Sequence, residues 1–86
     1  MKNKPKPIPK CKIGDLLIWK NDKGLISEIK TYPPEHTLYK GGTYYVIHWL
    51  TEQDNGFFII EREVSPVEGI EAQIEDKIYD YYPVIE

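Results

Sequence analysis

The chain has 86 residues, of which 41% are hydrophobic and 13% aromatic, a globular composition that can organise only one small core at this length. No apolar run approaches the roughly 20 residues that span a bilayer, and a single cysteine excludes an internal disulfide framework, so we expect a soluble cytoplasmic protein without a membrane segment. The net charge is −3, but residues 1–12 carry five lysines and no acid, which leaves −8 on residues 13–86.

Residues 1–12 are set apart by composition. Lysine alternates with proline in KNKPKPIPKCK, and proline favours extended polyproline II backbone and cannot seed a helix. We therefore predict a flexible basic arm. It is either a solvated terminus, the simpler interpretation, or a basic ligand for a groove or an anionic surface. Cys11, at its inner end, lacks a histidine and an acid at a useful spacing and is expected to be inert.

From Ile13 onward the pattern is that of short strands and turns. DLLIWK and LISEI are apolar runs separated by NDKG, whose Gly24 can adopt positive φ, and this combination predicts a β-hairpin. TYPPEHTLYKGG follows as a long loop, because its two prolines remove backbone donors and its two glycines permit a sharp turn.

TYYVIHWL is the clearest strand in the chain. Its alternation places Tyr45, Ile47 and Trp49 on one face and the remaining side chains on the other. TEQDNG is rich in turn residues and leads into FFIIERE, the predicted returning strand. VSPVEGI is predicted as one more short edge strand, a position in which Pro66 is tolerated.

The C-terminal segment, residues 71–86, has two interpretations. Ile70, Ile74 and Ile78 recur every four residues, which favours a helix, whereas KIYDYYPVI is equally typical of an extended run. We predict a short helix near residues 71–76 and an extended tail. The tyrosines of the tail would pack either on their own molecule or on a second copy, and the candidate self-association residues are Tyr79, Tyr81 and Tyr82.

Together these elements predict an all-β fold. Five short strands with one long loop are typical of a small five-stranded SH3-like barrel, which we place at residues 13–70 between the basic arm and an acidic aromatic C-terminal extension. The predicted core residues are Leu17, Trp19, Ile26, Ile29, Val46, Ile47, Trp49, Phe58 and Ile60.

Three motifs carry a resemblance to a known family. KIGDLLIWKNDKGLISEI, YYVIHWL and IEREVSPV together resemble the small, mostly uncharacterised SH3-like proteins of marine phages, especially cyanophages, which combine a Gly-Asp-apolar opening, a Gly-marked hairpin, a Tyr-apolar-Trp strand and an acidic closing segment. Tudor, chromo-like and KOW-type domains open in a similar way. The resemblance covers residues 12–70 and implies a phage-encoded protein in the host cytoplasm, with a place in the virion left open.

No catalytic or cofactor-binding motif stands out. His36 and His48 are twelve residues apart and Cys11 lies far upstream, so no pair of them has a structural zinc spacing and no metal site is predicted. The sequence contains no Gly-rich phosphate loop, nucleophile elbow or paired-carboxylate motif, and Glu61 and Glu63 are most simply a solvated strand end. We therefore expect a protein that is not an enzyme and has no cofactor.

Aromatic side chains form the candidate binding surface. The resemblance to SH3-like and Tudor-like folds implies a groove beside the long loop that receives a proline-rich peptide or, in an aromatic cage, a methylated lysine or arginine. The candidate residues are Tyr32, Tyr39, Tyr44 and Trp49. The competing interpretation is that most of them fill the core, because so short a chain needs nearly every large apolar side chain inside.

Two functions remain. The first is a non-enzymatic protein-interaction or assembly module, with a protein partner of unknown identity and self-association into a homo-oligomer. The alternative is a nucleic-acid accessory protein of the KOW or Tudor-like type, whose basic arm touches phosphates. The charge of −8 on residues 13–86 favours the first function, and binding of nucleic acid would be weak and strongly salt-dependent.

Overall fold

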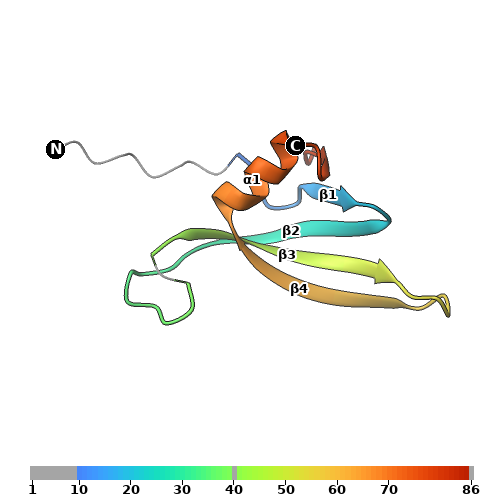
Figure 1. The fold of residues 1–86 in the computed structure, drawn as a ribbon, viewed down its shortest axis with the longest axis horizontal. Coiled ribbons are helices and arrows are strands. Elements are labelled where there is room, and N and C mark those ends of the chain that lie inside the picture. Colours follow the sequence, from blue (N-terminus) through green and yellow to red (C-terminus); the bar gives the residue numbers. More distant parts are fainter. Residues whose placement is uncertain (1–9, 40, 86) are drawn as a thin grey trace.

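A computed structural model describes residues 10–39 and 41–85 of the chain (Figure 1). Within them, five strands form one antiparallel sheet in the order β4-β3-β2-β1-β5. The strands are β1 (Leu16–Trp19), β2 (Asp22–Thr31), β3 (Thr43–Glu52), β4 (Phe58–Pro66) and β5 (Asp80–Tyr82), and a helix, α1 (Val67–Glu75), joins β4 to β5. The all-β prediction is thus confirmed as a five-stranded sheet with one short helix. No helix in the described part of the chain is long and apolar enough to cross a membrane.

The first hairpin forms where the sequence predicted it, but its glycine has a different role. β1 and β2 pair antiparallel with Trp19 opposite Asp22, and Lys20, at φ 56°, adopts the left-handed conformation in the turn. Gly24 instead lies inside β2, opposite Trp49 of β3. A Cβ atom on Gly24 would lie 2.8 Å from two ring carbons of Trp49, so this position accommodates the indole.

β2 contains a β-bulge that keeps two apolar residues on one face. The pairing of β2 with β3 shifts between Ile26 and Glu28, which leaves Ser27 as the extra residue. Because side chains alternate along a regular strand, Ile26 and Ile29 would otherwise face opposite sides of the sheet. With the bulge, Ile26 is buried in the core and Ile29 packs against it.

The core lies where α1 packs on one face of the sheet (Figure 1). α1 has no side-chain hydrogen bond at its N-cap, so its stability depends on the apolar residues that it buries, Val67 and Ile70. Tyr45 and Ile47 of β3 face them, as the alternation of this strand predicted. The buried cluster consists of Cys11, Leu17, Ile26, Tyr45, Ile47, Val67 and Ile70.

The predicted core is confirmed in part. The residues that are buried as predicted are Leu17, Ile26, Val46 and Ile47. Ile29 and Trp49 are partly buried against this core. The prediction was wrong for Trp19, Phe58 and Ile60, which are 40%, 57% and 70% exposed. Phe58 and Ile60 belong to β4, an edge strand, and lie opposite Glu52 and Leu50 of β3. Strand alternation turns both side chains to the face of the sheet that α1 does not cover, so no second layer buries them.

The fifth strand comes from the C-terminal segment. The prediction of an edge strand over VSPVEGI was wrong, because residues 64–66 end β4 and α1 begins at Val67. Pro66 has no amide to continue the ladder and occupies the N-cap position of α1. The helix predicted near residues 71–76 begins four residues earlier, so the predicted boundary at residue 70 falls inside α1. The extended tail pairs with β1 as β5.

Asp15, directly before β1, binds the C-terminal segment through hydrogen bonds. Its buried carboxylate accepts hydrogen bonds from the Lys12 amide at 2.8 Å, the Tyr81 hydroxyl at 2.5 Å and the Val84 amide at 2.8 Å. Burial by itself would raise the pKa of Asp15, but these hydrogen bonds outweigh it and hold that pKa below its usual value. The carboxylate therefore stays ionised and keeps its three donors.

Candidate functional site: an aromatic hollow with three carboxylates

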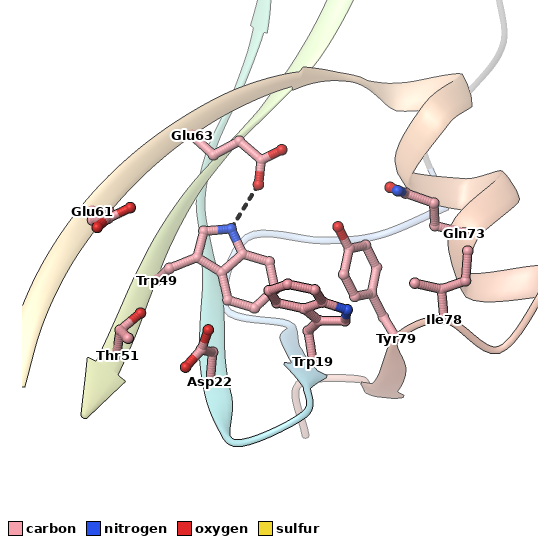
Figure 2. A pocket seen from close by; sticks show the side chains of 9 residues that line it. All are labelled: Trp19, Asp22, Trp49, Thr51, Glu61, Glu63, Gln73, Ile78 and Tyr79. Carbon is pink, nitrogen blue, oxygen red and sulfur yellow. Dashed lines mark hydrogen bonds between the residues drawn. The ribbon is translucent and has the colours of Figure 1, made fainter. Parts of the chain in front are cut away.

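A hollow of about 370 Å³ lies beside α1 on the core-facing side of the sheet. Its lining comes from β1, β2, β3, β4, α1 and the segment between α1 and β5, and Figure 2 shows these side chains converging. They are Trp19, Asp22, Trp49, Thr51, Glu61, Glu63, Gln73, Ile78 and Tyr79. We call this site the aromatic hollow.

Trp49 is placed by strand alternation and fixed by its neighbours. It lies on the core-facing side of β3, opposite Gly24 of β2 and Glu61 of β4. The indole occupies the space over Gly24, and its Nε1 donates a hydrogen bond of 2.7 Å to Oε1 of Glu63 (Figure 2). The position of the indole is therefore determined from two strands.

Trp19 and Tyr79 add two further aromatic rings. The ring centroids of Trp49 and Tyr79 are 5.6 Å apart at an interplanar angle of 45°. Trp19 ends β1 and contributes its indole to the same lining (Figure 2). The Nζ of Lys20 lies 4.8 Å from the centroid of the Trp19 ring, so this ring already receives a cation within its own molecule.

Three carboxylates line the same hollow: those of Asp22, Glu61 and Glu63. Within residues 10–39 and 41–85 no basic side chain lines the hollow or forms an ion pair with them. Glu63 is oriented by Trp49 and by the Ser65 hydroxyl, which donates to its other oxygen. Burial, together with the nearby charge of Glu63, raises the pKa of Tyr79. Negative charge beside aromatic faces is an arrangement that attracts a cation.

The predicted binding residues separate into two places. Tyr32, Tyr39 and Tyr44 gather around the loop between β2 and β3, with ring centroids 4.7 to 5.5 Å apart. His36 joins them, 5.5 Å from Tyr39, and its Nδ1 accepts hydrogen bonds from the amides of two loop residues. These rings pack chiefly on one another and give the loop a small core of its own. Trp49 lies apart from them, in the aromatic hollow.

The residues that surround Trp49 carry no site motif in the sequence. Their local patterns instead predict Trp19 in the core, Tyr79 in self-association, and Glu61 and Glu63 at a solvated strand end. The register of the hairpin between β3 and β4 is a signal that could have found Glu61, because it sets that residue directly opposite Trp49. No comparable signal exists for Tyr79, whose position depends on how α1 and β5 pack.

The C-terminal tyrosines are divided between the molecule's own core and its surface. Tyr79 lines the aromatic hollow, and the Tyr81 hydroxyl donates to the Asp15 carboxylate. Burial and this hydrogen bond raise the pKa of Tyr81. Tyr82 is 56% exposed. Tyr79 and Tyr81 thus pack within their own molecule, and self-association through Tyr82 stays a prediction.

Cys11, His36 and His48 lie in three different environments. Cys11 is buried in the core, His36 packs in the loop between β2 and β3, and His48 is exposed on β3. Burial raises the pKa of the Cys11 thiol, which makes it a poorer nucleophile at neutral pH. Among the residues that the structure describes, no group of three His, Cys, Asp or Glu side chains could hold a metal ion.

The aromatic hollow is therefore the strongest candidate for a binding site among the described residues. It combines three ring faces, three carboxylates and open volume in one place. Comparisons with protein-family models, with curated proteins and with solved structures find no match to this chain.

Proposed function

We propose that this protein is a non-enzymatic protein-interaction module that holds a basic side chain of its partner in the aromatic hollow. The observation that carries this proposal is the convergence of three aromatic rings with three carboxylates. These carboxylates form no ion pair with a basic side chain of the described residues. A lysine or arginine on a ring face gains about 0.5–2 kcal/mol. A volume of about 370 Å³ is also within the range of sites that enclose a ligand group.

The charge of the hollow favours a cationic protein segment over nucleic acid. Phosphate groups would be repelled by Asp22, Glu61 and Glu63, and residues 13–86 carry −8 in total. The alternative role as a nucleic-acid accessory protein would have to use residues 1–12 alone, whose five lysines are the chain's one strongly basic segment.

We also propose that the sheet is a variant of the small SH3-like barrel that the sequence resembles. Two features support this proposal. The last strand, β5, returns to pair with the first, β1, beside a single core, as in small barrels, and leaves β4 and β5 as the two edges of the sheet. The bulge at Ser27 increases the local twist and bend of β2, as curved sheets require.

Intrinsic fluorescence can test the binding proposal directly. Trp19 and Trp49 are the only tryptophans in the sequence, and both line the hollow, so their emission reports its occupancy. We expect a saturable change in emission when a lysine-rich peptide is added to the full chain. An acidic peptide of the same length should cause no change. The absence of a saturable response to the lysine-rich peptide would contradict the proposal.

Matched charge variants locate the binding. Asp22→Asn combined with Glu61→Gln removes two carboxylates from the hollow, and we expect affinity for the lysine-rich peptide to fall about twofold to thirtyfold, since exposed ion pairs contribute about 0.2–1 kcal/mol each. Asp54→Asn combined with Glu68→Gln removes the same charge from exposed positions outside the hollow. Equal affinities for the two double variants would mean that the peptide binds elsewhere.

A further inference from the structure

The chain carries a cationic segment of its own that complements the aromatic hollow. Residues 1–9 contain three lysines, Lys2, Lys4 and Lys6, and no acid. The hollow contains three carboxylates and no basic side chain among the described residues. The two parts of the chain therefore have matching opposite charges, and the aliphatic stems of lysines can also cover ring faces.

Lys10, the residue that follows this segment, lies on the side of α1 that faces away from the hollow. The Lys10 amide donates a long hydrogen bond of 3.4 Å to Glu71, and the Lys10 Nζ lies 3.5 Å from the Glu75 carboxylate. Glu71 and Glu75 are four residues apart and share one face of the helix. Gln73, which lines the hollow, is rotated from Glu71 by roughly 200° at 3.6 residues per turn.

This placement disfavours the arm's access to the hollow of its own molecule. Residues 1–9 span at most about 32 Å, at about 3.6 Å per residue in a fully extended chain. To reach its own hollow, the arm would have to bend around a helix about 10 Å in diameter, which would use much of that length. Prolines at positions 5, 7 and 9 oppose such a bend. The hollow of another molecule requires no bend of this kind.

We infer that the occupant of the aromatic hollow is the lysine-rich arm of a second copy of this chain, an inference that rests on the proposed function of the hollow. In the resulting dimer each copy inserts lysines from residues 1–9 between the rings and carboxylates of the other. A twofold arrangement of this kind closes with two identical contacts and leaves neither hollow open.

Light scattering coupled to size exclusion tests this inference on the full chain. We expect a dimer at high micromolar concentration and low ionic strength, which dissociates in about 0.5 M salt because the contacts are charge pairs screened within a few ångströms. Replacing Lys2, Lys4 and Lys6 with Gln should give a monomer, and so should Asp22→Asn combined with Glu61→Gln. As a control, replacing Lys23, Lys30 and Lys77 with Gln removes the same charge from the body and should leave the dimer intact.

Mixing the two monomeric variants provides the decisive measurement. The arm variant keeps an intact hollow and the hollow variant keeps an intact arm, so one contact can form between them. We expect a heterodimer with an affinity at least tenfold below that of the wild-type dimer. A monomeric wild-type chain, or a dimer that persists in the arm variant, would overturn the inference.

The same variants separate this inference from the function on which it rests. If the wild-type chain is monomeric but its tryptophan emission still responds to a lysine-rich peptide, the hollow binds cations and its partner is a different protein. If the arm variant binds that peptide more tightly than a monomeric wild type does, the arm occupies its own hollow, and the second-copy inference is wrong. If neither chain responds to the peptide, the proposed function is also wrong.

Discussion

Gly24 is a single residue on which the geometry of the aromatic hollow depends. Gly24→Ala would place a methyl group 2.8 Å from Trp49 and 2.9 Å from Ile47, so the indole and the buried Ile47 side chain would both have to shift. We expect the free energy of unfolding to fall by about 1–3 kcal/mol, as for other overpacked sites. The change can be measured by urea denaturation, and the tryptophan emission of the folded variant should shift.

Gly69 provides a matched control for Gly24. It lies on the exposed side of α1, and a Cβ atom there would meet nothing within 4 Å. Gly69→Ala is therefore expected to increase stability by about 0.5–1 kcal/mol, because alanine loses less backbone entropy than glycine in a helix. A similar loss of stability in both variants would contradict the packing argument for Gly24.

Asp15 is a second single residue on which the stability of the fold depends, since its carboxylate accepts hydrogen bonds from three donors. Asp15→Asn turns one acceptor into a donor and removes the charge. We expect a loss of about 2–3 kcal/mol in the free energy of unfolding at neutral pH, the usual cost of leaving buried groups unpaired. Asp54→Asn, in the exposed turn between β3 and β4, should change it by less than about 0.5 kcal/mol.

The lowered pKa of Asp15 also predicts how stability depends on pH. Its stabilising contribution is fully present above the unfolded pKa of about 3.9 and is lost as the pH falls through the lower pKa of the folded state. The free energy of unfolding of the wild type should therefore decline more steeply below about pH 4 than that of Asp15→Asn. Parallel pH profiles of the two proteins, measured by denaturant unfolding, would show that Asp15 does not contribute this dependence.

At the scale of elements, β5 is the strand that completes the fold. Removing residues 77–86 takes away the partner of β1, the Tyr81 hydroxyl and the Val84 amide. We expect the shortened chain to lose cooperative thermal unfolding, measured by circular dichroism, because a stability of about 5–15 kcal/mol in total cannot absorb these losses together. Removing residues 1–9 instead should leave cooperative unfolding intact. A shortened chain that lacks residues 77–86 and still unfolds cooperatively would show that β5 is dispensable.

At the scale of the whole molecule, the separation of charge governs what the protein can bind. Residues 13–86 carry −8 and residues 1–12 carry +5. We expect no binding of duplex DNA near physiological salt, as measured by fluorescence anisotropy. At low salt the dependence of affinity on salt should have a log–log slope no steeper than about −4.5, the limit for five lysines at about 0.9 each.

The arm variant with Lys2, Lys4 and Lys6 replaced by Gln gives the control for this measurement. Any binding of DNA at low salt should weaken strongly in it, because these lysines make up most of the basic charge of residues 1–12. Tight binding of DNA that persists at physiological salt would favour the role as a nucleic-acid accessory protein over the protein-interaction module.

The sequence by itself determined those features that depend on neighbouring residues. Strand alternation predicted the face of β3 that carries Tyr45, Ile47 and Trp49, and proline, glycine and asparagine predicted the long loop and the two hairpins. Composition alone separated a basic arm from an acidic body, although residues 1–9 lie outside the described part of the chain. These features are local because side-chain period and turn chemistry act over a few residues.

Only the tertiary structure decided which distant residues meet. Tyr81 and Asp15 are 66 residues apart in sequence, yet their hydrogen bond determines where the C-terminal segment lies. The bulge at Ser27, the early start of α1 at Val67 and the placement of Tyr79 beside Trp49 likewise depend on packing between separate elements. Each such contact depends on two segments that are distant in sequence, so the residues of one segment alone do not predict it.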